Sequence, residues 1–268
     1  MFIMKKYVLM CASALLLLGM GLVVASCRTG SVVTYAGGGC IAMDSVWDAA
    51  PDAEAVALLA PYKPRKDSVM NARVGTSAMD MDRERPESLL SNLVADVLRE
   101  AAEGVLGHPA DVAVMNIGGI RNPLSKGDIT VEDVYEILPF ENALCVLTMK
   151  GSVLNRLFAE MAAKGGEGLS GACLHISADG KLLEAIVAGQ PVDEGRMYTV
   201  ATIDYLAEGN DGMPSLAKAE EKVFPADMVL RDVFMRYVRQ QASVHRAVTS
   251  HLDGRIKICE TITLIEKQ

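Results

Sequence analysis

The chain has 268 residues, half of them hydrophobic and 22% charged, and its 34 acidic against 26 basic side chains give a formal net charge of −8. This length and composition support one domain with a sizeable core. The negative charge repels polyanions, so we expect neither a nucleic acid nor an anionic bilayer surface as a partner, whereas a small nucleotide responds to local arginines.

Residues 1–26 are expected to be a signal peptide. Lys5 and Lys6 form a basic start, residues 8–24 are apolar, and small residues lead into Cys27. The pattern is typical of a bacterial lipoprotein in which Cys27 receives lipid, and it predicts a protein anchored to a membrane of the cell envelope, on its periplasmic or extracellular face. An ordinary secretory signal that leaves Cys27 as a thiol is the alternative. A transmembrane helix is less well supported, because the apolar run is short.

Three segments follow this signal. Residues 27–50, with three consecutive glycines, are expected to form a tether and a strand that leads into the domain. Residues 51–258 form the expected single domain, and residues 259–268 form a C-terminal tail.

Helical and strand patterns alternate within the domain. Apolar residues recur at helical spacing from Pro86, which fits a first helical position, to Gly104. Thr130 opens a short helix with a capping box, and Asp227 is expected to cap the last helix. The other expected elements are a strand at 144–149, a helix at 153–161 that ends before the glycines 165–166, a hairpin of 172–177 with 182–187 around Asp179-Gly180, and a strand at 197–203. This mixture predicts an α+β fold.

The cysteines indicate neither a zinc ribbon nor a redox pair. Six are present, Cys11 lies in the expected signal peptide, and none forms a Cys-x-x-Cys pair. Cys145 and Cys173 fall within apolar strand patterns and are expected to be buried thiols. A disulfide stays open as an alternative, because its pairing cannot be read from the sequence.

A glycine-rich turn follows the apolar run at residues 111–115. Gly118 and Gly119 allow backbone N–H groups to approach a ligand closely, because no Cβ is in the way. Asn116 adds an amide that both donates and accepts, and Arg121 adds a planar fork of donors. The turn therefore suits an anion or a polar ring, although alone it also fits a plain turn beside a surface arginine.

Four further segments share the order and spacing of one known family. They are residues 86–93, 127–130, 138–142 and 205–212, and the last two read Leu-Pro-Phe-Glu-Asn and Tyr-Leu-Ala-Glu-Gly-Asn-Asp-Gly. The chain resembles the C-terminal, substrate-recognition domain of the 5′-nucleotidase and UDP-sugar hydrolase family over roughly residues 51–258. This resemblance implies a single layered α/β/β/α domain.

The resemblance also implies a substrate-binding set. In the family two aromatic rings clamp a base, and Phe140 and Tyr205 match their positions; stacking contributes about 1–3 kcal/mol per base. Asp211 matches the carboxylate that accepts hydrogen bonds from the sugar hydroxyls. Asn116 matches the residue that reads the base edge, and Arg121 matches the arginine on the ribose and phosphate side. Without this resemblance, Phe140 and Tyr205 would be interpreted as core aromatics and Asp211 as part of a tight turn.

The phosphate side departs from the family pattern. Glu84 stands where the family often has a second arginine, three residues before the glutamate that Glu87 matches. Arg83 and Arg85 flank this position, and we do not expect either to replace the missing side chain. The base clamp is therefore expected to be intact and the phosphate grip to be weakened.

The sequence carries no motif of a two-metal phosphatase centre, which requires clustered His, Asp and Asn ligands. The four histidines are His108, His175, His245 and His251. They stand in none of the metallophosphatase spacings, and the chain has neither a Ser–His–Asp elbow nor a phosphate loop. We therefore expect no catalytic residue, no metal and no cofactor in this chain, with divalent metals only in a partner metallophosphatase.

Three functions are compatible with these patterns. The chain could be the nucleoside- or nucleotide-recognition part of a 5′-nucleotidase-type hydrolase system for nucleotide catabolism, with the metallophosphatase as a separate subunit. It could instead be a stand-alone, lipid-anchored nucleoside or nucleotide binder. The third is a structural or interaction lipoprotein with a decayed pocket, which the joint presence of the substrate-binding set disfavours. We favour the first.

Overall fold

The computed structural model describes residues 37–41 and 45–259. The predicted signal peptide, Cys27 and part of the tether lie outside these residues, as does the predicted tail beyond Cys259. The chain divides into two compact units, residues 1–56 and residues 57–268. The described part of the first unit holds a 3-10 helix, η1 (Ser45–Ala49). The strand that was predicted within residues 27–50 is not found among the described residues of that segment.

The described strands of the second unit form three sheets. The first pairs β1 (Arg73–Ser77) with β3 (Gly127–Thr130). The second has the order β10 (Glu221–Val223), β4 (Leu144–Lys150), β9 (Met197–Ile203), β2 (Val112–Met115) and β5 (Gly168–Ser170). The third has the order β11 (Ile256–Cys259), β6 (Ala172–Ser177), β7 (Leu182–Val187) and β8 (Gln190–Pro191). Pairing is antiparallel except for β2 with β9 and β11 with β6.

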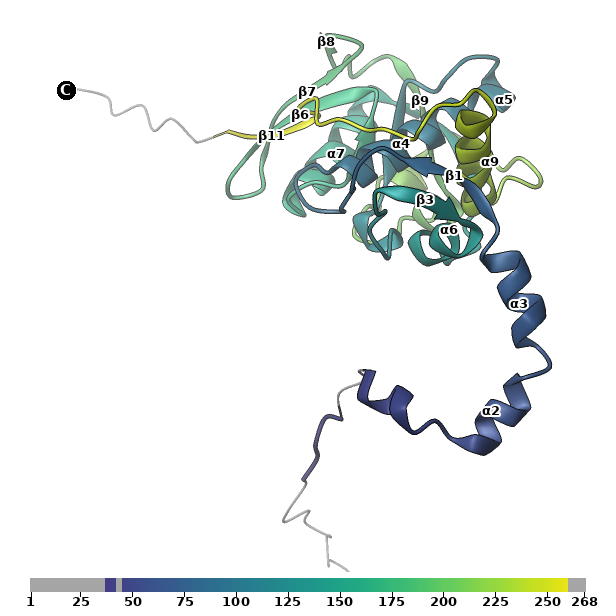
Figure 1. Ribbon diagram of the computed structural model, residues 1–268. Coiled ribbons are helices and arrows are strands. Elements are labelled where there is room, and N and C mark those ends of the chain that lie inside the picture. The colour runs from purple at the N-terminus through teal and green to yellow at the C-terminus, as the bar shows by residue number, and fades with distance from the viewer. Residues whose placement is uncertain (1–36, 42–44, 260–268) are drawn as a thin grey trace, which may run out of the picture. The chain divides into compact units, whose positions relative to one another are not determined.

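Figure 1 shows the helices that the described residues form. In chain order they are α2 (Ala53–Leu59), α3 (Lys63–Met70), α4 (Leu89–Ala101), α5 (Glu103–Leu106), α6 (Val131–Ile137), α7 (Gly151–Ala163), α8 (Asp204–Ala207) and α9 (Leu230–Ser243), with the 3-10 turns η2 (Ile117–Gly119) and η3 (Leu216–Lys218). Helix α4 packs on β2, β5 and β9, α7 contacts strands of the second and third sheets, and α9 packs against α4 and β1. The predicted α+β fold is confirmed as a layered arrangement of helices and sheets.

The core consists of the apolar faces that the sequence periodicity indicates. Phe158 on α7 and Phe234 on α9 are among the largest fully buried side chains. The strands at 172–177, 182–187 and 197–203 have the predicted bounds, and Gly180 takes a positive φ of 80° in the hairpin turn. The predicted capping box is also confirmed, since the Thr130 hydroxyl accepts from the Asp133 N–H and the Asp133 carboxylate accepts from the Thr130 N–H.

Two predicted helix starts are wrong by a few residues. Helix α4 begins after Ser88 rather than at Pro86, because Ser88 and Ser91 form a capping box that satisfies free N–H groups of the first turn. Helix α9 begins after Val229 rather than Asp227. Residue Val229 bridges to Ala143 in an extended conformation, which delays the helix and leaves Asp227 outside it with a φ of 58°.

The four described cysteines, Cys40, Cys145, Cys173 and Cys259, are free thiols. Cys145 is buried as predicted, and burial raises the pKa of its thiol to about 11, although the Lys222 charge acts in the opposite direction. Cys173 is only partly buried, so that prediction is wrong: side chains alternate along β6, and the buried face belongs to Leu174 and Ile176.

Candidate functional site

One cavity of about 360 Å³ gathers most of the predicted substrate-binding residues. Its lining consists of Asn116, Gly118, Gly119, Phe140, Asn142, Tyr205 and Asp211. Six of the seven predicted residues are therefore brought together from positions up to 95 residues apart in the chain. The seventh, Arg121, is exposed and lies beside the cavity, where its guanidinium carbon is 6.0 Å from the centre of the Phe140 ring.

The floor of the cavity is the turn that follows β2. Asn116 is the N-cap of η2, and the Gly119 N–H donates to the Asn116 carbonyl at 3.0 Å. A Cβ on Gly119 would lie 2.6 Å from Met115 Cε and 2.7 Å from Asn116 Oδ1, so any larger residue here would displace these two side chains. A Cβ on Gly118 would meet nothing closer than 3.6 Å, so the crowding is confined to Gly119.

Two aromatic rings border the same cavity. Phe140 lies in the loop after α6 and is 47% exposed, and Tyr205 lies on α8 and is 45% exposed. Arg231 holds the Phe140 loop, since its Nη1 donates to the Pro139 carbonyl at 3.2 Å and its guanidinium stacks 4.0 Å from the Tyr135 ring centre. About half of each aromatic residue is therefore exposed and available to a ligand.

Asp211 is held from two sides. Asn116 Nδ2 donates to its Oδ2 at 2.7 Å, and Lys164 Nζ donates to its Oδ1 at 2.7 Å and to its backbone carbonyl at 2.6 Å. Burial acts to raise the pKa of the Asp211 carboxyl, but the hydrogen bonds from Lys164 and Asn116 and the charges of Lys164 and Arg85 outweigh it and hold the pKa below its ordinary value. The carboxylate at the cavity is therefore ionised at neutral pH.

A buried carboxylate supports this arrangement from behind. The side chain of Glu167 is fully buried and accepts from Lys164 Nζ at 2.9 Å, from Arg85 Nη2 at 2.5 Å and from the Ile117 N–H at 2.6 Å. The same lysine therefore joins Asp211 to the residue that anchors the turn with Gly118 and Gly119. Burial acts to lower the pKa of Lys164, but its hydrogen bonds to Asp211 and Glu167 raise it above the ordinary value.

The sequence analysis missed Asn142, Lys164 and Glu167, and it considered Arg85 only as a replacement for the missing phosphate-side arginine, whereas Arg85 pairs with Glu167. Asn142 belongs to the Leu-Pro-Phe-Glu-Asn segment and follows Phe140 by two residues, which was the available signal. Lys164 and Glu167 flank Gly165-Gly166, and these two opposite charges around a turn could have indicated the pair. The glycines were interpreted only as the end of a helix.

The amide groups of the cavity differ in what they can still bind. Asn116 Nδ2 is used by Asp211, and its buried Oδ1 has no hydrogen-bond partner within residues 37–41 and 45–259. Asn142 makes no side-chain hydrogen bond in the described part of the chain. Asn142 therefore offers its whole amide, whereas Asn116 keeps its Oδ1 acceptor and one of the two N–H donors of Nδ2.

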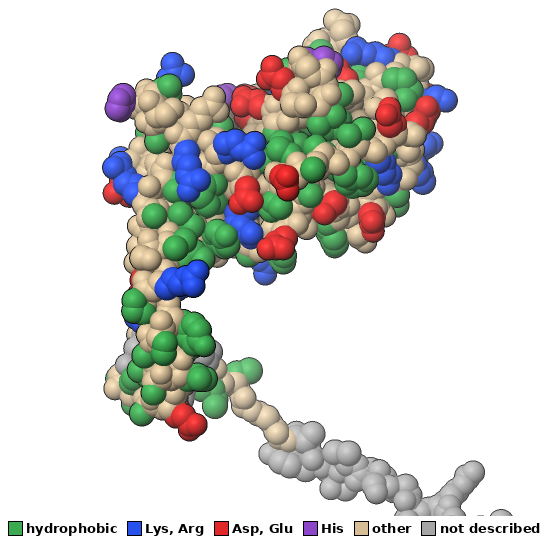
Figure 2. Space-filling view, turned by 90° about the vertical axis from the view of Figure 1, so that its right-hand side faces the viewer, with side chains coloured by type: hydrophobic (Ala, Val, Ile, Leu, Met, Phe, Trp, Pro, Cys, Tyr) green, Lys and Arg blue, Asp and Glu red, His purple; other side chains and the backbone are tan. Residues whose placement is uncertain are grey.

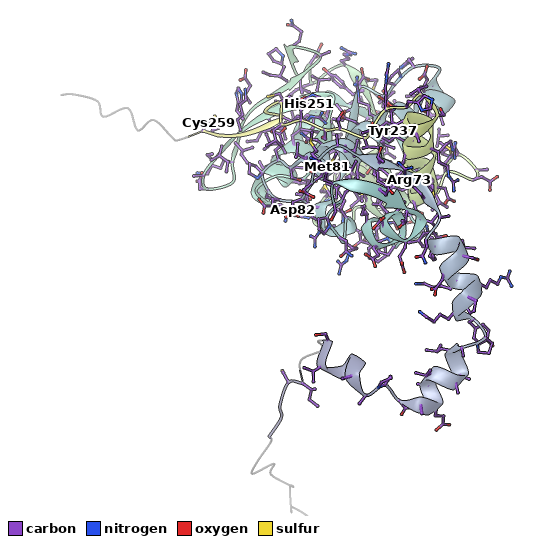
Figure 3. The ribbon with its side chains drawn as sticks, viewed as in Figure 1. Arg73, Met81, Asp82, Tyr237, His251 and Cys259 are labelled. Carbon is purple, nitrogen blue, oxygen red and sulfur yellow. The ribbon has the colours of Figure 1, made fainter. Side chains whose placement is uncertain are left out.

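The histidines do not form a metal centre. His108 contacts the Pro109 carbonyl, His175 pairs with Glu184 at 2.9 Å, and His251, labelled in Figure 3, lies 3.6 Å from Asp253. Within the described residues, no three His, Cys, Asp or Glu side chains are grouped closely enough to hold one metal ion. The donor sets that the structure describes therefore do not fit the two-metal centre of a phosphatase.

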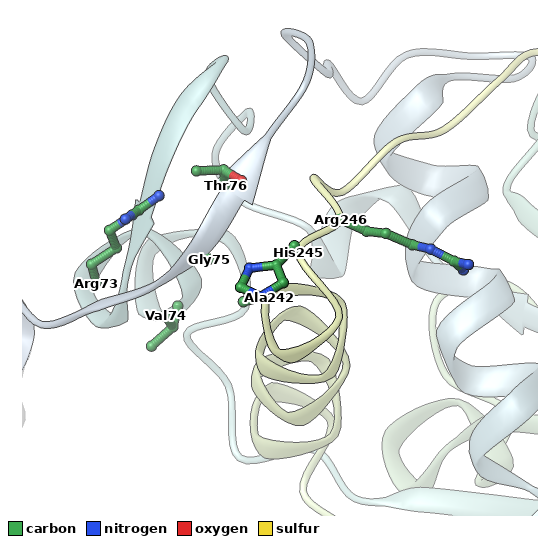
Figure 4. A pocket seen from close by; sticks show the side chains of 7 residues that line it. All are labelled: Arg73, Val74, Gly75, Thr76, Ala242, His245 and Arg246. Atoms are coloured by element: carbon green, nitrogen blue, oxygen red, sulfur yellow. The ribbon is translucent and has the colours of Figure 1, made fainter.

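A second cavity of about 400 Å³ lies between β1 and the end of α9 (Figure 4). Its cationic side chains do not converge, since Arg73 and Arg246 extend in opposite directions from His245 and Arg73 is paired with Asp128 at 2.8 Å. Over the face of the second unit in Figure 2, acidic and basic side chains are interspersed rather than separated by sign. None of the described helices has both the length and the apolar character that crossing a bilayer requires.

Comparisons with known proteins show the family of the chain. The family model for the 5′-nucleotidase C-terminal domain matches residues 69–218, more than half of the chain. UshA from Yersinia enterocolitica is 32% identical over 173 residues, which cover 62% of this chain and 31% of that protein. The NAD 5′-nucleotidase of Haemophilus influenzae is 25% identical and aligned over 75% of this chain and 38% of its own length.

The structure of a 5′-nucleotidase precursor from Thermus thermophilus is similar as well. It matches with a TM-score of 0.66 and 28% identity, over 79% of this chain and 44% of the Thermus chain. The protein belongs to the 5′-nucleotidase C-terminal domain family. It spans about a third of the length of the curated relatives that it matches.

Proposed function

We propose that the chain binds a nucleoside or nucleotide in the 360 Å³ cavity, as the recognition part of a 5′-nucleotidase-type hydrolase system whose catalytic metallophosphatase is another chain. One observation carries the proposal: two half-exposed aromatic rings and an ionised carboxylate line the same cavity. Ligand cavities typically hold about 300–1,000 Å³ and combine apolar walls with a few polar groups, and this cavity matches both features.

The base occupies the space between Phe140 and Tyr205 in this proposal. Stacking on aromatic rings contributes about 1–3 kcal/mol per base and tolerates different bases. The Asn142 amide pairs with the base edge, because its donor and acceptor are both available, and Asn116 Oδ1 accepts from a nearby N–H or O–H of the ligand. This assigns edge recognition chiefly to Asn142, where the family resemblance points to Asn116.

The sugar lies against Asp211. Each carboxylate oxygen has one protein donor and a remaining lone pair, so the group can accept one hydrogen bond from each hydroxyl of a cis-diol. Arg121 lies at the rim, 6.0 Å from the Phe140 ring, and supplies the exposed cation for a 5′-phosphate. The phosphate therefore projects out of the cavity, toward a partner that holds the reacting group.

The metals belong to that partner in the proposal. The described residues lack a suitable donor set, so the chain alone contributes binding and orientation. We further propose that lipid on Cys27 holds the protein at a membrane of the bacterial cell envelope, with the recognition domain on the periplasmic or extracellular side. We propose no nucleic acid as a partner, because the net charge of −8 repels polyanions and the face in Figure 2 presents basic and acidic side chains interspersed.

Calorimetric titration tests the binding claim. Adenosine and its monophosphate should each bind the purified chain saturably at one site, and failure of both ligands to bind would refute the proposal. Phosphate release tests the second claim: the chain alone should release none from the monophosphate with magnesium, manganese, zinc or cobalt added, and robust metal-dependent turnover would contradict it. Co-purification of a metallophosphatase separates a split hydrolase from a stand-alone binder.

A further inference from the structure

Lys164 occupies an unusual position behind the cavity. It follows the last residue of α7, and its ammonium group contacts Asp211 Oδ1 at 2.7 Å, the Asp211 carbonyl at 2.6 Å and Glu167 Oε1 at 2.9 Å. An ammonium group has three N–H donors, and these three acceptors use all of them. Lys164 therefore has no free donor for a ligand, so its effect on binding must act through Asp211.

The backbone of Asp211 has an uncommon conformation. Its φ is 53°, in the left-handed region that costs energy for residues other than glycine and is tolerated mainly by Asn and Asp. The hydrogen bond from Lys164 to the Asp211 carbonyl fixes the peptide in this turn, and the bond to Oδ1 fixes the side chain. With Asn116 on Oδ2, rotation of the carboxylate would break two hydrogen bonds.

The anchor of Lys164 is itself rigid. Glu167 is fully buried, accepts from the Ile117 N–H and pairs with Arg85. The lysine therefore connects Asp211 to the turn that carries Gly118 and Gly119, so the two sides of the cavity are held at a fixed separation. The cations Lys164 and Arg85 balance the carboxylates Asp211 and Glu167. Arg121 is therefore left as the cation for a ligand phosphate.

We propose that Lys164 is a positioning residue that sets the preference of the cavity for a sugar with both 2′- and 3′-hydroxyl groups. It holds the Asp211 carboxylate so that the free lone pair of each oxygen points to one hydroxyl, and this order exists before the ligand arrives. The inference rests on the proposed function, because it concerns the sugar end of the same nucleoside site.

The test compares adenosine with 2′,3′-dideoxyadenosine by calorimetry on the full protein. The wild type should bind adenosine more tightly. In Lys164→Met the affinity for adenosine should fall about 10-fold, while that for the dideoxy compound changes by less than about 2-fold, because only the diol contact depends on the orientation of Asp211. A merely structural role would lower both affinities equally.

Lys181→Met is the matched control, since Lys181 also pairs with an aspartate, Asp179, at 2.7 Å but is exposed and absent from the cavity lining. It should leave both affinities unchanged. If the methionine variant does not fold, Lys164→Gln keeps an amide donor and should show the same selective loss to a smaller extent.

The outcomes separate the two claims. If the wild type prefers adenosine and Lys164→Met, or the glutamine variant, keeps the same preference, the positioning role is overturned while the proposed function stands. If the wild type binds neither compound, the proposed function fails and the role of Lys164 fails with it.

Discussion

Replacing Tyr205 with alanine removes one wall of the proposed base clamp while leaving the rest of the cavity in place. Tyr205 is 45% exposed, so the change does not open a hole in the core, and the thermal midpoint should change little. The other ring that lines the cavity, Phe140, stays in its loop. The substitution therefore isolates the contribution of one stacking face.

The expected loss follows from the geometry. Aromatic stacking contributes about 1–3 kcal/mol per base, which corresponds to an increase in the dissociation constant of about 5- to 150-fold. A value near the middle of this range, about 10-fold or somewhat more, is expected because Phe140 still covers the other face of the base. Tyr205→Phe keeps the ring and should bind within about 2-fold of the wild type.

Calorimetric titration with adenosine measures these changes, and thermal unfolding checks that each variant is folded. Tyr62→Ala is the matched control, because Tyr62 is 70% exposed and does not line the cavity. The reasoning would be refuted if Tyr205→Ala bound adenosine as tightly as the wild type. It would also be refuted if the Tyr62 variant lost as much affinity as the Tyr205 variant.

Three further predictions concern the supporting structure. Gly119→Ala should lower the thermal midpoint, because the new Cβ would lie 2.6 Å from Met115 Cε, whereas Gly118→Ala should not; equal midpoints would contradict this. Glu167→Ala should reduce the free energy of unfolding, measured by denaturant titration, by about 2–3 kcal/mol. This is less than the about 3–5 kcal/mol expected for a fully buried pair, because Arg85 and Lys164 retain contact with water. The control Glu221→Ala, at an exposed edge strand, should cost far less in the same titration. Adenosine affinity should be constant between about pH 5 and pH 9. Because the pKa of Asp211 is lowered, the contribution of its carboxylate to adenosine binding is lost only as the pH falls through that lowered value. Because the pKa of Lys164 is raised, the contribution of its ammonium group is lost only as the pH rises above the ordinary range of a lysine. A titration midpoint of the affinity between about pH 5 and pH 9 would argue against this pair.

Local patterns predicted the elements of the fold well where one interaction dominates. The strand at 197–203 and the hairpin around Gly180 depend on side-chain alternation and turn chemistry, which are local properties. The start of α9 was misplaced because a long-range bridge between Val229 and Ala143 holds the preceding backbone extended. No local pattern contains that contact.

The same distinction applies to the site. The resemblance of motif order and spacing to a known family identified Asn116 and Asp211 as residues of one site. These residues are 95 positions apart in the sequence and hydrogen-bonded in the structure. The network of Lys164 and Glu167 was missed because a charge beside glycines reads as a solvated turn, and its burial follows only from packing against Arg85 and the Ile117 backbone. Buried ion pairs of this kind depend on tertiary structure, since each member is stable only when its partner is present.

A crystal structure of the protein with adenosine tests the central claim most directly. The account predicts the base between the rings of Phe140 and Tyr205, with both ribose hydroxyls within hydrogen-bonding distance of the Asp211 carboxylate. Adenosine bound elsewhere on the molecule, or in the cavity with its ribose turned away from Asp211, would contradict it.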